Sequence, residues 1–421
     1  MPITKNKISS PFSKTSQHDQ KYKTILSVSS NLFNIHGTRG TTLTQIANEL
    51  KLTKTSLYYY VSTKEELVYQ CYLNTCVEMQ AMVDIALEHN GSAINKLEHL
   101  LKLNFDCWND ILNGNRGHLA GLTEIASLSN EHKKEISQYY RNFVIQVINL
   151  IKEGQTDGSI QQVDPAKTSN AIWGTILWLP VWLTNVPIHQ RDDAFSDWVS
   201  LIKTGLKKSQ SFEFSHFDFD ELSTAPDGFD KKTQNRKKQE AFYRVGTRFF
   251  NQKGFKGTSL DEIAKSLGVT KGAFYYHIKN KDDLLAKCFE RTLTIEKTVL
   301  QQASDMKVSG IEKLAYAAQR LFDIQVGEVG PLIRYATMWS FPHETRKNLE
   351  IETTKIRSQF GKLINEGIMD SSIKATNLLV AENIIAGAIE SIPDMNLSID
   401  GTEINQDANN FYHIFFNGIA T

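Results

Sequence analysis

The sequence is poor in the features that stabilise secreted or membrane-embedded proteins. Its 421 residues include only four cysteines, Cys71, Cys76, Cys107 and Cys288, which form no CxxC pair and no zinc-like spacing with histidines. A reducing compartment and a packing role for these thiols are therefore predicted. The N-terminus has no apolar stretch after its charges, and the apolar run 171–187 is shorter than the about 20 residues of a membrane span. This run predicts a buried helix instead.

Catalytic motifs are also missing. The chain has no HExxH, no GxSxG, no phosphate-binding glycine loop and no dinucleotide fingerprint. We therefore predict that the protein is not an enzyme and needs no cofactor. The stretch 218–228 starts like a calcium loop, but Leu222 and Ser223 interrupt its alternating oxygen ligands, so no metal site is predicted.

The chain has no net charge, because 47 basic residues balance 47 acidic ones. The charges are unevenly distributed. Residues 1–67 hold 9 basic and 4 acidic residues, residues 231–284 hold 13 and 5, and residues 211–230 hold 6 acidic residues and no basic one. Two separate positive segments are expected where a chain contacts a polyanion such as nucleic acid.

The two positive segments contain a repeat. Residues 37–67 match residues 254–284 without a gap at 13 of 31 positions, at a constant offset of 217. The match resumes with "LIKEGQTDGSI" from Leu150 against "LINEGIMDSSI" from Leu363, at an offset of 213. The duplication therefore covers both the basic module and the apolar helices that follow it.

Each basic module predicts three helices. An amphipathic helix ends at Gly37 in the first copy and at Gly254 in the second. A second helix starts at a capping box, "TLTQ" from Thr42 and "SLDE" from Ser259. A tight turn then leads to a third, short helix, and this arrangement is a helix-turn-helix unit whose last helix enters the DNA major groove.

The tight turn and the cap after it differ in one respect between the copies. The turn has Gly268 in the second copy but Lys51 in the first, so Lys51 must adopt a strained backbone or open the turn slightly. Thr53 and Thr270 are predicted to cap the third helix.

The two segments "GTRGTTLTQIANELKLTKTSLYYYVSTKEEL" and "GFKGTSLDEIAKSLGVTKGAFYYHIKNKDDL" resemble the tetracycline-repressor (TetR) family of bacterial regulators. The resemblance is strong over about 50 residues of each copy and weaker in the regions behind them. It implies an all-α fold with two tandem helix-turn-helix DNA-binding modules, each followed by a helical-bundle regulatory domain. Most such regulators are single-module homodimers, so the tandem arrangement is a departure.

Helical angles separate the faces of the third helix. Leu57 and Val61, and in the second copy Phe274 and Ile278, are predicted to face inward. The opposite face is predicted to contact DNA, and the resemblance adds a lysine at the start of the next helix as a phosphate contact. The DNA-binding candidates are Thr42, Lys54, Thr55, Ser56, Tyr58, Tyr59 and Lys64 in the first copy and Ser259, Lys271, Gly272, Ala273, Tyr275, Tyr276 and Lys281 in the second. The second copy has fewer groups that can read bases. Capping alone explains Thr42 and Ser259, and a solvated surface is the alternative for the two later lysines.

The resemblance further implies that the regions behind the modules bind an apolar effector and pair through a four-helix bundle. The pocket candidates are Phe105, Trp108, Trp173, Trp178, Tyr335 and Trp339. By composition alone, such an aromatic stripe is more often core. The helices at 172–180 and 385–393 are the candidates for the surface that joins the two halves.

The predicted division of the chain is a flexible basic arm (1–18), a first DNA-binding module (19–67), a first ligand-binding and dimerisation-like domain (68–209), an acidic linker (210–233), a second module (234–284) and a second such domain (285–421). The predicted function is a cytoplasmic, nucleoid-associated transcriptional repressor that binds an operator as an intramolecular pseudo-dimer and is relieved by a small apolar effector. Further homodimerisation stays open. The alternative is a ligand-binding or adaptor protein in which one helix-turn-helix no longer reads DNA.

Overall fold

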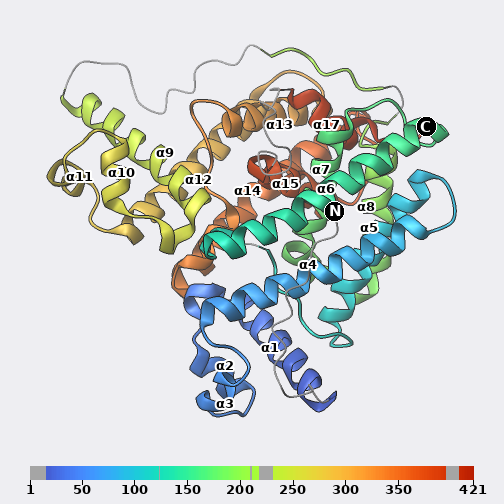
Figure 1. The fold of residues 1–421 in the computed structure, drawn as a ribbon. Helices are drawn as coiled ribbons and strands as arrows, with labels where there is room; N and C mark the ends of the chain where they lie inside the picture. The colour runs from blue at the N-terminus through green and yellow to red at the C-terminus, as the bar shows by residue number, and fades with distance from the viewer. Residues whose placement is uncertain (1–15, 123, 209–210, 218–230, 395–406) are drawn as a thin grey trace.

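The computed structural model describes residues 16–122, 124–208, 211–217, 231–394 and 407–421. The elements in these ranges are all helical, apart from two isolated β-bridges, which confirms the all-α prediction (Figure 1). Most of the predicted N-terminal arm and the calcium-like stretch 218–228 lie outside the described residues.

The two halves run through the same succession of helices. The first half contains α1 (Ser16–Gly40), α2 (Leu43–Glu49), α3 (Lys54–Tyr58), α4 (Lys64–Glu88), α5 (Ala93–Leu112), η1 (Ile125–Ser127), α6 (Asn130–Asp157), α7 (Pro165–Trp182), η2 (Leu183–Asn185), η3 (Ile188–Gln190) and α8 (Arg191–Thr204). The second half contains α9 (Lys231–Gly257), α10 (Leu260–Ser266), α11 (Lys271–His277), α12 (Lys281–Asp305), α13 (Gly310–Val326), η4 (Tyr335–Ser340), α14 (His343–Met369), α15 (Leu378–Ser391), η5 (Ile392–Asp394) and α17 (Ala408–Asn417).

Backbone breaks fall at matching positions of the two modules. Gly37 has φ 68° and Gly254 has φ 65°, and each interrupts the helical conformation of its helix where the sequence predicted an end. In the turn before the third helix, Lys51 has φ 54° and Gly268 has φ 65°. Lys51 therefore adopts the left-handed conformation that a glycine takes more readily, and the turn keeps its shape at a conformational cost.

The caps are alike at the third helices but differ at the second helices. Thr53 and Thr270 each accept a backbone N–H at the start of α3 and α11, as predicted. Thr42 forms the predicted capping box on α2. The capping box predicted at Ser259 is wrong, because the Ser259 side chain makes no cap hydrogen bond and the carboxylate of Glu262 accepts a bond from Lys253 Nζ at 2.6 Å instead.

The repeated "EGxxDxS" segment has a structural role that is the same in both halves. Asp157 Oδ2 accepts the N–H of Ala93 at 2.9 Å, and Asp370 Oδ2 accepts the N–H of Gly310 at 2.7 Å. Each aspartate therefore satisfies a free amide in the first turn of an earlier helix, α5 for Asp157 and α13 for Asp370. Between the aspartate and the serine, Gly158 and Ser371 take positive φ values of 79° and 67°.

Helices α7 and α15 join the halves at a close crossing. A Cβ at Gly174 would lie 3.0 Å from Gly387 O, and a Cβ at Gly387 would lie 3.1 Å from Gly174 O. The same Cβ atoms would meet Ser391 and Trp178, which are themselves equivalent positions of the repeat. The crossing is therefore reciprocal and leaves no room for a side chain at either glycine.

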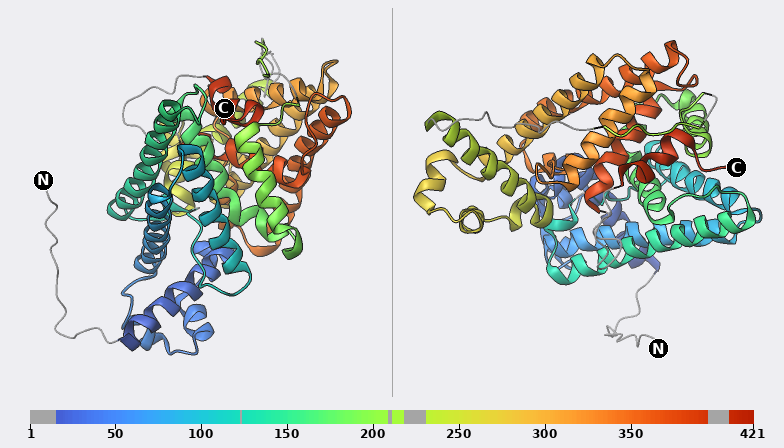
Figure 2. Two further views of the ribbon diagram at one scale, coloured as in Figure 1. Left: turned by 90° about the vertical axis from the view of Figure 1, so that its right-hand side faces the viewer. Right: turned by 90° about the horizontal axis from the view of Figure 1, so that it is seen from above.

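The terminal helices of each half complete this contact by crossing to the other half. α17 packs on α7, α8 packs on α15, and α8 packs on α17, so the four helices form one bundle. Beyond the bundle, Gln161 N donates to Ile419 O at 2.9 Å and Lys374 N donates to Leu206 O at 2.9 Å. At the offset of 213, Gln161 is equivalent to Lys374 and Leu206 is equivalent to Ile419. The second bond therefore repeats the first with the halves exchanged, as a two-fold relation requires. Figure 2 shows the long helices of the two halves on either side of this region.

The two helix-turn-helix modules lie side by side at their bases and point outward. In Figure 1, α2 and α3 form the lower end of the molecule, while α10 and α11 form its left side. The contacts at the bases are crossed: α1 packs against η4 of the second half, and α9 packs against η1 of the first. The short helices α3 and α11 lie at the outer ends of their modules.

The described start of the predicted linker is packed against the second half. Phe212 and Phe214 lie against the ring of Phe416 on α17, with ring centroids 5.2 Å and 5.0 Å away. The side chain of Asn417 also accepts the N–H of Phe212 at 2.7 Å. Residues 211–217 therefore connect the first half to the terminal helix of the second.

The apolar helix and the thiols behave as packing elements. Within the described part of the chain, no helix combines the length and apolarity needed to cross a bilayer, and this includes α7. Cys71, Cys76, Cys107 and Cys288 are free and buried. Burial raises the pKa of Cys71, Cys76 and Cys288 to about 12, so these thiols stay protonated and unreactive.

A leucine in place of Gly387 tests the helix crossing. Gly387→Leu should lower the free energy of unfolding by about 1–3 kcal/mol, because the new side chain would overlap Trp178 and the α7 backbone. Urea unfolding followed by far-UV circular dichroism measures this. Gly272→Leu is the matched control, since nothing lies within 4 Å of a Cβ there, and it should stay within about 0.5 kcal/mol of the parent. Equal stability of the two variants would contradict the crossing.

Candidate nucleic-acid interface

The third helix of the first module has one buried face and one exposed face. Leu57 and Val61 are 1% and 4% exposed, whereas Tyr59 is 74% exposed. Thr55 and Ser56 are also exposed. α3 therefore presents two hydroxyls and an aromatic ring to solvent on the face predicted to meet DNA, with Tyr58 half-exposed beside them.

The third helix of the second module has the same division with different side chains. Phe274 and Ile278 are fully buried, and Tyr276 is 84% exposed with Tyr275 half-exposed. The exposed positions equivalent to Thr55 and Ser56 are Gly272 and Ala273. α11 therefore presents tyrosines but no hydroxyl in its first turn, and it has few groups that can distinguish one base from another.

The first lysine of each third helix is held differently. Lys54 Nζ lies 5.7 Å from the centre of the Tyr58 ring. Lys271 Nζ lies 2.5 Å from the Asp261 carboxylate on α10, and this hydrogen bond raises the pKa of Lys271. Because the residue equivalent to Asp261 in the first module is Thr44, Lys54 meets no such carboxylate. Part of the positive charge on α11 is therefore already neutralised within the module.

Lys64 and Lys281 bind backbone carbonyls at equivalent positions. Lys64 Nζ donates to Thr41 O at 2.6 Å, and Lys281 Nζ donates to Thr258 O at 2.9 Å. Burial lowers the pKa of both lysines, helped by the neighbouring charge of Lys256 at Lys64 and of Arg39 at Lys281. Each lysine thus ties the start of α4 or α12 to the segment before the second helix, a role that neither of the two sequence interpretations included.

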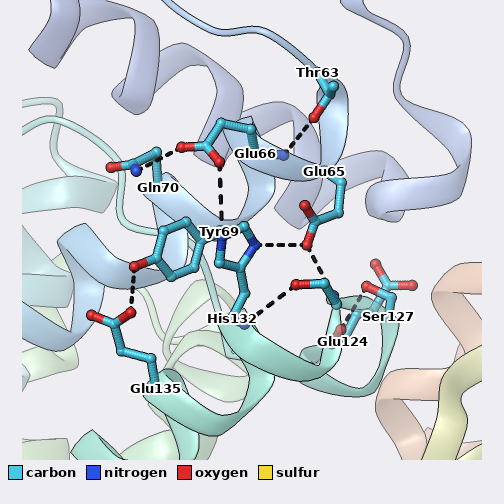
Figure 3. Close-up of polar contacts among 10 residues, drawn as sticks. Thr63, Glu65, Glu66, Tyr69, Gln70, Glu124, Ser127, His132 and Glu135 are labelled. Carbon is cyan, nitrogen blue, oxygen red and sulfur yellow. Dashed lines mark hydrogen bonds and ion pairs between the residues drawn. The ribbon is translucent and has the colours of Figure 1, made fainter.

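The acidic residue after each of these lysines has a different partner in the two halves. In the first half, Glu65 Oε1 accepts the N–H of Ser129 at 2.9 Å and lies 2.9 Å from His132 Nδ1 (Figure 3). Burial alone would raise the pKa of Glu65, but these hydrogen bonds hold that pKa below its ordinary value. His132 also stacks on Tyr69 with ring centroids 3.7 Å apart. α4 is therefore fixed to the start of α6.

In the second half, the equivalent residue Asp282 binds the first module instead. Arg39 Nη1 lies 3.0 Å from Asp282 Oδ1 and donates to Ser340 O at 3.1 Å. Its guanidinium also lies 4.0 Å from the centre of the Phe255 ring. Arg39 therefore joins the bases of both modules and the η4 segment. Sequence reasoning missed this residue because its partners are more than 200 positions away and no local pattern marks them.

A carboxylate beneath the same junction holds the break in α1. Glu124 Oε2 accepts the N–H of Thr38 at 2.7 Å. Burial raises the pKa of Glu124, while the Thr38 hydrogen bond and the charges of Lys256 and Lys64 oppose the rise. One buried acidic side chain thus interacts electrostatically with a lysine of each module, Lys64 and Lys256.

A separate cavity of about 590 Å³ lies between the two halves. Its walls come from α1, α5 and α7 of the first half and from η4, α14 and α15 of the second. Of the predicted pocket residues, Trp108, Trp178, Tyr335 and Trp339 line it, whereas Phe105 and Trp173 are fully buried side chains outside its lining. Its volume is within the range of about 300–1,000 Å³ found for small-molecule sites.

The η4 segment connects this cavity with both modules. Tyr335 and Trp339 line the cavity, and the backbone oxygen of Trp339 lies against Gly37, where a Cβ would approach it to 2.5 Å. Met338, in the same segment, is buried in the apolar core of the second module. Movement of η4 would therefore act on the break in α1 and on the second module at once.

Two helix-turn-helix units with exposed third helices, each fixed to a helical domain, define a DNA-binding protein of the helix-turn-helix class. Among the described residues, no group of three or more His, Cys, Asp or Glu side chains could hold a metal ion. The family described as "Bacterial regulatory proteins, tetR family" matches residues 25–71 and again 243–288, and "Tetracyclin repressor-like, C-terminal domain" matches residues 92–186. The chain belongs to the tetR family, with the family unit in tandem.

Individual relatives cover one unit at a time. The TetC protein of transposon Tn10 from Escherichia coli is 31% identical over 148 residues, which are 33% of this chain and 69% of that protein. The biofilm operon icaADBC negative transcriptional regulator IcaR of Staphylococcus aureus (strain Newman) is 26% identical over 130 residues, 30% of this chain and 67% of that protein. A tetR-family regulatory protein structure from Rhodococcus RHA1 has a TM-score of 0.39 and 22% identity, covering 43% of this chain and 94% of that one.

Alanine at Lys64 or Lys281 tests whether these lysines also contact phosphate. Each variant should weaken DNA binding to a similar degree across sequences and reduce the slope of log affinity against log salt by about one, because one counterion-releasing contact is lost. Fluorescence anisotropy at several salt concentrations measures the slope. Lys152→Ala, at an exposed position of α6, is the control and should leave the slope unchanged.

The carbonyl contacts require a stability measurement beside this one. Both variants should also unfold at lower urea concentration, since each loses its bond to Thr41 O or Thr258 O. Reduced stability together with an unchanged salt slope would show that these lysines only hold the module together.

Proposed function

We propose that this protein is a transcriptional repressor in which one chain binds an operator through α3 and α11 and releases it when a small effector binds. The division into DNA-binding modules at 19–67 and 234–284, each with its own regulatory domain, is part of this proposal, as is action on DNA in the cytoplasm. Membership of the tetR family supports the regulatory role. The name of the relative IcaR, a negative transcriptional regulator, supports repression.

The observation that carries the pseudo-dimer is the reciprocal contact between the halves. At the α7–α15 crossing, Gly174 lies against the backbone of Gly387 in the same way as Gly387 lies against the backbone of Gly174. The hydrogen bonds from Gln161 to Ile419 and from Lys374 to Leu206 repeat this exchange at the ends of the bundle. A homodimer has such isologous contacts between two subunits, and this chain has them between its own halves.

The proposed release mechanism runs through η4. An effector in the cavity would contact Tyr335 and Trp339, and the backbone of Trp339 abuts Gly37 at the end of the long part of α1. Arg39, two residues later, holds Ser340 and Asp282. A shift of η4 would loosen the contact between the modules and change the separation of α3 and α11, on which operator binding depends.

Two observations favour the adaptor alternative. The first turn of α11 exposes Gly272 and Ala273, and its lysine is paired with Asp261. A module with these features could hold DNA through its phosphates without reading sequence, or not hold it at all. An experiment that measures sequence information separately in each half of the operator distinguishes these outcomes.

Selection of binding sites from a random DNA pool tests the proposal. We expect an imperfect operator in which substitutions under the first module cost about 1–3 kcal/mol each and substitutions under the second cost less. Thr55→Ala with Ser56→Ala should flatten the preference in the first half-site, because the hydroxyls that face the groove are removed. Thr156→Ala, which removes an exposed hydroxyl from α6 outside both modules, is the control, and it should leave both half-sites unchanged.

The stoichiometry of the complex is the second readout. One 47.7 kDa chain should occupy one operator in light-scattering chromatography of the complex. A perfect palindrome with equal information in both halves, or two chains on each operator, would contradict the single-chain pseudo-dimer. Absence of any selected sequence would favour the adaptor alternative.

A further inference from the structure

The cavity between the halves has aromatic walls on two sides. Trp108 and Trp178 come from the first half, and Tyr335 and Trp339 come from the second. The rings of Trp178 and Tyr335 meet edge to face, with centroids 5.1 Å apart. Such walls favour a flat apolar body, because aromatic surfaces contribute large contact areas and defined stacking geometry.

One cation lies against these rings and has an unused donor. The Arg357 guanidinium is 5.8 Å from the centre of the Trp178 ring and 5.5 Å from that of Tyr335. Its Nη2 donates to Thr354 Oγ1 at 3.1 Å. Its Nη1 is buried and meets no hydrogen-bond acceptor among the described residues. A buried charged donor without an acceptor is costly, and a ligand oxygen would relieve that cost.

The carboxylates that line the cavity already have partners. Glu350 Oε1 lies 3.5 Å from Arg346 Nε, and Glu390 Oε1 accepts the N–H of Tyr335 at 2.8 Å. Arg346 in turn lies 4.4 Å from the centre of the Trp339 ring. The third arginine of the lining, Arg334, adds another positive charge, so three arginines face two carboxylates.

Two carboxyl groups, those of Glu296 and Glu382, interact electrostatically with Arg357. Burial raises the pKa of Glu296 to about 7, and burial also raises the pKa of Glu382, with the charge of Arg357 opposing both shifts. At neutral pH, Glu296 is therefore partly protonated and offsets only part of the charge of Arg357.

The repeat offers no second copy of this site. At the offset of 213, the position equivalent to Arg357 is Val144, which is fully buried, and the position equivalent to Trp178 is Ser391. The cation and the ring beside it thus occur once in the chain, although the frame around them occurs twice. One ligand for each chain is the stoichiometry that this arrangement supports.

We propose that this cavity binds one small molecule per chain, with a flat apolar or aromatic body held between the rings and a single anionic group held by Arg357. This deepens the proposed function, on which it rests, by assigning the effector to a class of amphipathic organic anions rather than to purely apolar compounds. The anion completes the hydrogen bonding of Arg357, and the body lies against Tyr335 and Trp339 of η4.

A matched pair of dyes tests the proposal on the full-length chain without DNA. 8-Anilinonaphthalene-1-sulfonate has an aromatic body and a sulfonate, and N-phenyl-1-naphthylamine has the same body without the charge. In fluorescence titrations, the parent chain should bind one sulfonate dye and prefer it to the neutral dye. Arg357→Gln should weaken the sulfonate dye by about tenfold or more and change the neutral dye by less than about twofold.

Two further variants provide the controls. Lys355→Gln removes a neighbouring positive charge from the exposed side of the same helix, where its partner is Glu352, and it should change neither affinity. Arg357→Lys keeps the charge but loses the planar guanidinium that lies against the rings, so it should retain only part of the preference for the sulfonate dye. Because the neutral dye reports an intact cavity, unchanged binding of it excludes misfolding as the cause of a lost preference.

Several outcomes would overturn the proposal. These are equal weakening of both dyes by Arg357→Gln, no weakening of either, a parent chain that prefers the neutral dye, or two equivalent sulfonate sites for each chain. Because no DNA is present, such a failure would leave operator binding untouched. Conversely, the expected dye behaviour in a chain that binds no operator would refute the proposed function alone.

Discussion

The close approach of two glycines at the crossing of α7 and α15 is the constraint on which the rest of the structure depends. Neither Gly174 nor Gly387 could carry a side chain without displacing the other helix. This contact brings α8 and α17 into one bundle and sets the tails of the halves within hydrogen-bonding distance. It also fixes the distance between the walls of the cavity, since Trp178 and Ser391 flank the same crossing.

The two halves have equivalent helices, but several equivalent side chains make different contacts. The two aspartates that cap α5 and α13 and the two lysines that bind Thr41 and Thr258 are the same device used twice. By contrast, Glu65 is fixed within its own half, whereas its equivalent Asp282 reaches Arg39 of the other module. A homodimer cannot divide these roles, because a substitution in one subunit appears in both.

Local features of the fold could be predicted from the sequence. Helical periodicity separated Leu57 from Tyr59 correctly, and the hydroxyl before the third helix identified its cap in both copies, because neighbours along the chain determine these features. The capping box at Ser259 failed for a reason that is not local to its motif. Lys253, six residues earlier and on the other side of the break at Gly254, donates to the Glu262 carboxylate, so the group that the motif assigned to the cap bonds elsewhere.

Contacts between the halves could not be predicted in this way. Arg39 and Asp282 are separated by 243 residues, and no pattern in the sequence connects them. The cavity combines aromatic side chains of α5 and α7 with aromatic side chains of η4. The sequence therefore indicated which residue types line the cavity, but not where these residues meet. For the same reason, Phe105 and Trp173, which have the composition of a pocket, are core residues in the structure.

The covalent connection between the halves has a consequence for how the molecule responds to dilution. Two separate subunits dissociate when their concentration falls below the dissociation constant, but the α7–α15 contact here forms within one chain, so its effective concentration does not depend on copy number. If one chain acts alone, as proposed, occupancy of its operator should follow the first power of protein concentration rather than the second. One half of such a chain also cannot be replaced by half of another protein through dissociation.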